Sequence, residues 1–164
     1  MNIFRRVLLA LLPIAASQPE SAAQQDPFLM EGWTVYQGTY QGRAIIVRAN
    51  TALKQFKHKE SFPFRLGLAF PLRQPDENGM AVDRENQELY AIEDRLDSAL
   101  TKQKVALPAL VISTGGMREF VFYCKQPESA KKEVEALKRA ISTHELQYYI
   151  EQDKDWEMFS EHAQ

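Results

Sequence analysis

Cysteine, histidine and excess charge are scarce in this sequence, and each shortage argues against a class of function. The one cysteine among 164 residues, Cys124, leaves no disulfide to form within the chain. The three histidines (His58, His144 and His162) are scattered, with no two at the i, i+4 spacing of a helical metal site. We therefore predict no metal and no cofactor, and we place all three histidines in solvated or helix-capping positions. A formal net charge of −2 lacks the basic footprint of a nucleic-acid-binding domain, so we predict no nucleic-acid partner.

Long apolar runs are also missing. The run nearest the N-terminus, residues 7–16, is ten residues long, whereas a bilayer-spanning helix needs about 20. Two arginines precede this run and small residues at 21–23 follow it, which together are typical of a secretory signal. We predict that residues 1–23 are a signal peptide and that the mature protein is periplasmic or secreted, without a transmembrane segment. The alternative is a retained N-terminal helix.

The rest of the chain is predicted to be a linker, residues 24–32, and a single α+β domain, residues 33–164. The domain is expected to open with a β-hairpin, in which Trp33–Tyr40 and residues 43–49 flank a Gln-Gly turn. The basic stretch 54–59 that follows is predicted to be a solvated loop.

A second hairpin, residues 107–124, is the most apolar part of the domain. Gly115 and Gly116 suit a two-residue turn that needs positive φ. The flanking strands carry apolar residues on both of their faces, at odd and at even positions alike. We therefore expect both faces to be covered. Cys124 ends this hairpin, and we interpret it as a small core residue; a reactive free thiol is the alternative.

Apolar side chains recur at helical spacing in two regions. Leu89, Ile92, Leu96 and Leu100 form one stripe, which predicts a helix with one buried face. A second helix is expected to begin at Pro127, because proline is tolerated in the first helical turn.

Strands before and after these helices complete the predicted fold. Phe64–Pro71 alternates with period two, residues 145–150 form a further strand, and Asp153 can cap a short last helix. The order strand, helix, strand, strand, helix, strand predicts a ferredoxin-like βαββαβ antiparallel sheet. To this α+β core we add the N-terminal hairpin and the short C-terminal helix. Strands 64–71 and 117–124 are expected to be central neighbours.

Several short motifs resemble a known family. They are Trp33-x-x-Tyr36, Phe62-Pro63-Phe64, Gly79-Met80, Leu89-x-x-Ile92-Glu93-Asp94-x-Leu96, Thr114-Gly115-Gly116-x-Arg118-Glu119-Phe120-x-Phe122-Tyr123 and Asp155-Trp156. In these motifs the chain resembles the bacterial domain of unknown function 695 family. That family is similar in predicted architecture to the ribonuclease E inhibitor B family. The resemblance implies an α+β, non-catalytic, protein-binding module.

The most distinctive polar feature is an acidic cluster on the first predicted helix, formed by Glu93, Asp94 and Asp97. Helical period places Glu93 inside the apolar stripe, where a carboxylate needs a partner. No basic residue of the same helix can reach it, so we expect the partner to come from the sheet or a loop, with Arg118 or Arg65 as candidates. Glu93, Asp94, Asp97 and Arg118 are therefore the candidate binding residues, and a solvated helix face is the alternative.

The sequence favours a non-catalytic module that binds a protein or a small ligand, because it contains no recognisable nucleophile–base pair and no metal-ligand set. We therefore predict no catalytic residues. One alternative is a hydrolase-type enzyme that uses Glu93 and Asp97 with a distant arginine or tyrosine; a pocket that gathers those groups would favour it. Another is a cytoplasmic regulator like the ribonuclease inhibitors, which requires that the N-terminus is retained.

Overall fold

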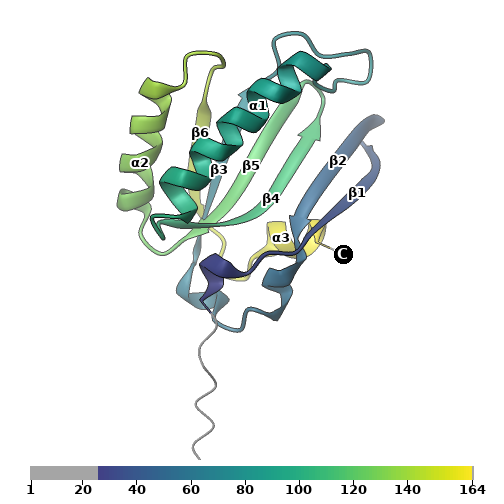
Figure 1. The fold of residues 1–164 in the computed structure, drawn as a ribbon. Helices are drawn as coiled ribbons and strands as arrows, with labels where there is room; N and C mark the ends of the chain where they lie inside the picture. Colours follow the sequence, from purple (N-terminus) through teal and green to yellow (C-terminus); the bar gives the residue numbers. More distant parts are fainter. Residues whose placement is uncertain (1–25, 164) are drawn as a thin grey trace, which may run out of the picture.

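One antiparallel sheet of six strands forms the centre of the domain, with its strands in the order β1-β2-β4-β5-β3-β6 (Figure 1). The computed structural model describes residues 26–163. The strands are β1 (Trp33–Tyr40), β2 (Arg43–Asn50), β3 (Phe64–Pro71), β4 (Ala106–Thr114), β5 (Met117–Cys124) and β6 (Gln147–Gln152). Every neighbouring pair of strands is antiparallel.

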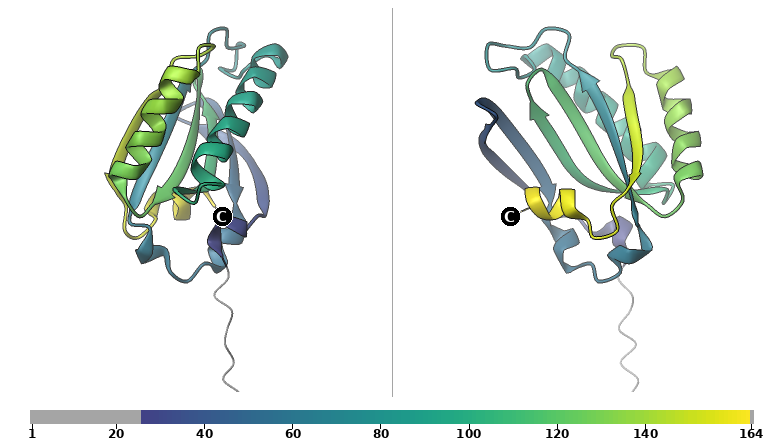
Figure 2. Two further views of the ribbon diagram at one scale, coloured as in Figure 1. Left: turned by 60° about the vertical axis from the view of Figure 1, so that its left-hand side comes forward. Right: turned by 180° about the vertical axis from the view of Figure 1, so that it is seen from behind.

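Helices cover both faces of this sheet, but unequally. The two long helices, α1 (Asp83–Leu96) and α2 (Pro127–Ala140), lie on one face (Figures 1 and 2). The short helix α3 (Glu157–His162) lies on the other face, where it contacts β2 and β4. The remaining helical segments are a π-helical turn, Asp97–Thr101, that continues α1, and three 3-10 turns, Pro27–Leu29, Thr51–Gln55 and Lys59–Ser61.

The predicted α+β class with an antiparallel sheet is confirmed. Strands β3 and β5 are paired neighbours over their full length, as expected. The N-terminal hairpin extends the sheet, because β2 pairs with β4 along one edge. The ferredoxin-like topology is not confirmed, since the strand order of the six-stranded sheet differs from that of a four-stranded ferredoxin-like domain.

The β4–β5 hairpin is apolar on both faces because it separates two cores. Gly115 and Gly116 form its two-residue turn, with φ of 58° and 82°. Phe120 and Phe122 pack under α1 and α2, whereas Val121 and Tyr123 face the second core beneath α3 and the 3-10 turns. The prediction that both faces are covered is therefore correct.

The apolar stripe of the first helix is buried as predicted. Leu89, Leu96 and Leu100 are fully buried and Ile92 is 3% exposed. The α-helix ends before Leu100, however, and a wider π-helical turn carries that residue. Hydrogen bonds from the backbone N–H of Lys102 to the carbonyl of Asp97 (2.9 Å) close this turn.

The second core explains two segments that sequence patterns describe less well. The stretch 54–59 was predicted as a solvated loop; it begins within the 3-10 turn Thr51–Gln55, in which Leu53 is fully buried, and Phe56 is only 9% exposed. Lys54, Gln55, Lys57 and His58 are exposed as predicted, and the prediction was wrong for Phe56, a single apolar residue that anchors the stretch. In the segment predicted as the 24–32 linker, Met30 is buried and its carbonyl accepts a hydrogen bond from Asn50 (2.8 Å).

The C-terminal helix folds back as predicted. Asp153 Oδ1 accepts a hydrogen bond from the backbone N–H of Glu157 (2.8 Å), which caps α3. Trp156 stacks on Tyr123 with ring centroids 4.0 Å apart, and Phe159 is buried beside it. The predicted signal peptide, residues 1–23, lies outside the described residues.

Candidate functional site

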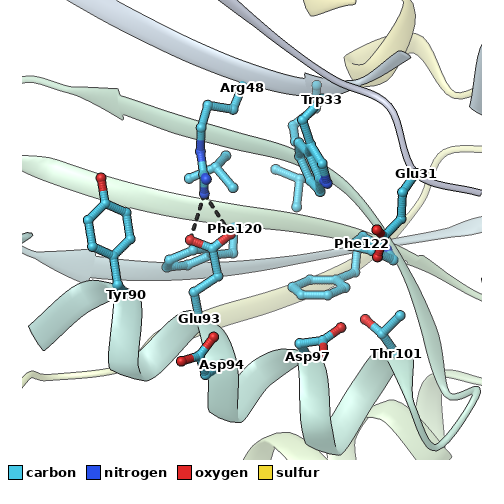
Figure 3. Close-up of a pocket in the computed structure, with 14 residues that line it drawn as sticks. Glu31, Trp33, Arg48, Tyr90, Glu93, Asp94, Asp97, Thr101, Phe120 and Phe122 are labelled. Carbon is cyan, nitrogen blue, oxygen red and sulfur yellow. Dashed lines mark hydrogen bonds and ion pairs between the residues drawn. The ribbon is translucent and has the colours of Figure 1, made fainter. Parts of the chain in front are cut away.

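A groove of about 340 Å³ separates α1 from the β1–β2 hairpin (Figure 3). Its floor is apolar and comes from the middle of β4 and β5, where Val111, Phe120 and Phe122 face the helices. Its walls are polar: α1 and the π-helical turn form one, and the hairpin with the residues before it forms the other. The groove exists because α1 and α2 cover β4, β5, β3 and β6, and no helix formed by residues 26–163 covers the hairpin on this face (Figure 1).

An ion pair crosses this groove. Nη2 of Arg48 on β2 lies 2.6 Å from both carboxylate oxygens of Glu93 on α1. Arg48 faces α1 because it pairs in register with Val111, whereas its neighbours Val47 and Ala49 point into the second core. Both partners keep about a third of their side chains exposed, 32% for Arg48 and 28% for Glu93. The prediction that the partner of Glu93 comes from the sheet is correct, but the two arginines named for it are wrong.

Those two arginines are held elsewhere. Arg65 lies on the opposite face of the sheet, where it pairs with Glu151 and approaches Asp153 at 3.6 Å. Arg118 lies on the helix face, beyond the lining of the groove; it donates to Asn86 (2.8 Å) and Ser113 (3.0 Å). Burial lowers the pKa of the Arg118 guanidinium from its ordinary value. Arg118 is thus a neighbour of the groove without lining it.

The three predicted acids all line the groove, and a fourth joins them from the chain before β1. Asp97 lies 3.1 Å from Lys102 in an exposed ion pair. The side-chain carboxylates of Asp94 and Glu31 form no hydrogen bond or ion pair with any other residue in the described part of the chain. The acidic cluster therefore forms one rim of a concave surface, and Asp94 in this rim is solvent-exposed.

Aromatic side chains frame the groove above its floor. Trp33 on β1 is 40% exposed and Tyr90 on α1 is 53% exposed. The guanidinium of Arg48 lies 5.6 Å from the centre of the Trp33 ring, a cation–π distance that orients both groups. Exposed aromatic rings beside charged groups are typical of surfaces that bind ligands or partners.

The π-helical turn places one further polar group at the groove. Thr101 is 8% exposed, and its Oγ1 is buried without a hydrogen-bond partner among the described residues. Its oxygen is directed toward the groove, near Phe122 (Figure 3). Single π-helical turns within α-helices are found frequently at functional sites.

Comparison with known protein families shows which family this chain belongs to. Residues 31–162 match a family of unknown function, DUF695, over nearly the whole chain. The chain belongs to the DUF695 family. Searches of curated proteins and of solved structures found no match, so the likeness of this DUF695 domain to the ribonuclease E inhibitor B family stays a prediction. In the described residues of the DUF695 domain, no helix is both long and apolar enough to cross a membrane.

Five polar or aromatic residues of the groove in this DUF695 domain were missed by sequence reasoning: Glu31, Trp33, Arg48, Tyr90 and Thr101. Arg48 carried a usable signal, because it interrupts an apolar strand at a position that alternation assigns to one face. Trp33 and Tyr90 looked like ordinary strand and helix residues. Their shared surface depends on β2 pairing with β4, which no local pattern specifies.

One histidine was also misplaced. His144 was expected to be solvated or capping, yet its side chain is fully buried and its Nε2 lies 3.1 Å from Oε1 of Glu85. Burial alone would raise the pKa of Glu85, but hydrogen bonds from the backbone N–H of Arg73 (2.6 Å) and Gln74 (3.3 Å) and from His144 outweigh it. The pKa of Glu85 consequently lies below its ordinary value. No group of three side chains suited to a metal occurs in the described residues.

Proposed function

We propose that the DUF695 domain is a non-catalytic binding module whose groove, between α1 and the β1–β2 hairpin, takes a small ligand or a side chain of a protein partner. The observation that carries this proposal is the groove itself, which combines an apolar floor with a few convergent charged groups. Its volume of about 340 Å³ lies in the range of small-ligand sites.

The state of the charged groups favours binding over catalysis. Glu93 is held by Arg48, and Asp97 by Lys102. The lining residues include no serine, cysteine or histidine, and the Thr101 hydroxyl is hydrogen-bonded to no base in the described part of the chain. A hydroxyl or thiol nucleophile needs an adjacent base or a lowered pKa to react. Among the described residues, the groove lining supplies no such activated hydroxyl or thiol group.

A capture experiment tests this proposal. The full chain and a Trp33→Ala/Tyr90→Ala variant would each serve as bait in an extract of the producing cell's envelope, with mass spectrometry of co-purified proteins and small molecules. Both side chains are exposed, so the variant should remain folded. We expect molecules that are enriched by the wild type and lost with the variant. Equal enrichment by both baits would reject the groove as the binding site.

A hydrolase-type enzyme is the second candidate, because the groove brings Glu93 and Asp97 together with Arg48 and Tyr90. In that role one carboxyl group would act as an acid or base toward a bound substrate. The test is an assay of the full chain against esters, glycosides and phosphate monoesters, with Glu93→Gln as the comparison. Turnover that Glu93→Gln abolishes in a folded protein would replace the binding proposal.

We also propose that the domain acts outside the cytoplasm. The support is the sequence pattern of residues 1–23, with its arginine pair, ten-residue apolar run and small-residue site. A cytoplasmic role like that of a ribonuclease inhibitor would require these residues to be retained.

For the fold, we propose that the segment from β3 to β6 is a ferredoxin-like unit extended by the hairpin. The support is the order β6-β3-β5-β4 within the sheet, with α1 and α2 on one face.

A further inference from the structure

We propose that the groove recognises a primary ammonium group on an aliphatic stem, either a free diamine or a lysine side chain. This inference rests on the binding function proposed above and names the chemistry of its ligand. It is argued from the end of the groove that Glu31, Asp97 and Thr101 form around Phe122 (Figure 3).

The charge balance of the groove favours a cation. Four carboxylates line it, from Glu31, Glu93, Asp94 and Asp97, and Arg48 is the one basic residue in the lining. Arg48 is committed to Glu93. The pair between Asp97 and Lys102 is exposed, and such pairs contribute little, so an incoming cation can replace the lysine. Glu31 and Asp94 have no partner among the described residues, which leaves negative charge that a ligand can neutralise.

The Thr101 hydroxyl is a second and independent indication. A buried hydroxyl without a hydrogen bond is costly, and native proteins leave few such groups. Thr101 Oγ1 is buried, directed toward the groove and unpartnered in the described part of the chain. An ammonium group carries three N–H donors, which matches two carboxylates and one hydroxyl. An anionic ligand would instead meet the carboxylates with repulsion.

The apolar part of the groove suits the stem of such a ligand. Phe122 and Phe120 form the floor, and Trp33 stands above them from the opposite wall. Aliphatic stems of lysine pack along apolar surfaces while the charged end stays with polar groups. A cation beside an aromatic ring gains a further electrostatic attraction.

Fluorescence titration of the full chain tests this inference. Of the two tryptophans, Trp33 lines the groove and Trp156 is fully buried, so a ligand in the groove changes the emission of Trp33. The probes are pentane-1,5-diamine, Nα-acetyl-lysine amide, pentane-1,5-diol and glutarate. We expect saturable binding of the two amines, no binding of the diol, and loss of the signal in Trp33→Phe. Tighter binding of the diamine points to a free amine, and tighter binding of the lysine derivative points to a protein side chain.

Matched variants locate the contacts. Glu31→Gln combined with Asp97→Asn should weaken diamine binding by about tenfold or more, because two charge-assisted hydrogen bonds to the ammonium group are replaced by neutral ones. Thr101→Val should weaken it several-fold and Thr101→Ser should restore it. Glu77→Gln, an exposed acid outside this groove, should change nothing. Circular dichroism and the denaturant midpoint of each variant would show that the fold is retained.

Two results with the diamine would overturn the inference. One is equal binding of diol and diamine, and the other is undiminished diamine binding by the Glu31→Gln/Asp97→Asn variant. A third result concerns the anion: if glutarate binds, and Arg48→Met weakens that binding, the groove recognises an anion. This result would overturn the ammonium inference and leave the proposed binding function in place. If no probe binds and the capture experiment shows no difference between baits, both proposals fail.

Discussion

Arg48 and Glu93 lie 45 positions apart in the sequence and meet at 2.6 Å, and their ion pair joins β2 to α1 across the groove. It ties the N-terminal hairpin to the helix layer. We interpret the pair as a structural element that also sets the width of the groove, because one partner stands on each wall.

Glu93→Gln should lower the free energy of unfolding by about 1–2 kcal/mol, between the values for exposed and fully buried pairs. The reason is that the amide keeps the shape of the carboxylate but loses its charge, while Arg48 stays half-buried. Urea unfolding measures the change. A double-mutant cycle with Arg48→Met provides the control, since the double variant should lose less stability than the sum of the two single variants if the two side chains interact. Additive effects of the two substitutions would show that the pair contributes nothing.

Leu96→Ala should destabilise the domain by about 2–5 kcal/mol, because truncation leaves a cavity in a well-packed core. Leu96 is fully buried between α1 and the sheet. Leu29, which is 78% exposed, offers a matched control, and Leu29→Ala should change stability by less than about 0.5 kcal/mol. Denaturant midpoints compare the two. Equal midpoints for both variants would contradict the packing of α1.

Local periodicity was enough to predict most elements of this fold. The stripe from Leu89 to Leu100 and the strand Phe64–Pro71 were both correct, since their side chains repeat with the period of the element that they form. The Gly115-Gly116 turn was equally clear, because positive φ at both positions favours glycine.

The site was harder to predict, because it depends on which strands become neighbours. Glu93 was correctly expected to need a partner from the sheet, but the choice of Arg48 requires that β2 pairs with β4. Nothing in the local sequence fixes that pairing. The same holds for His144, whose burial depends on a carboxylate 59 positions away. Long-range pairs of this kind become visible only once the sheet order is known.

Exported protein should lack residues 1–23. The pattern of this segment matches a cleaved secretory signal in its charge, apolar length and small-residue site. Intact-mass measurement of the protein purified from its own cells, with periplasmic and cytoplasmic fractions kept apart, decides the matter. A full-length chain in the cytoplasmic fraction would remove the proposed placement and favour the cytoplasmic alternative.

Cys124 should be unreactive in the folded protein. It is fully buried at the end of β5, and burial raises the pKa of its thiol to about 11, so little thiolate forms near neutral pH. With a thiol-reactive dye at pH 8, we expect slow labelling of the native chain and rapid labelling in denaturant. Rapid labelling of the native chain would instead support a reactive thiol.

Glu85 should make the domain sensitive to acid. Because the folded-state pKa of Glu85 lies below its ordinary value of 4.5, its contribution to stability is complete above that value and is lost as the pH falls through the folded value. Glu85→Gln should cost about 1–3 kcal/mol at neutral pH, since it breaks a buried hydrogen-bonded group, and should flatten the decline in acid. Urea midpoints between about pH 7 and pH 3 test this, because stability then follows proton uptake by the unfolded chain. The exposed Glu77→Gln variant should keep the wild-type slope, and an equally steep decline in Glu85→Gln would show that another carboxyl group controls the acid response.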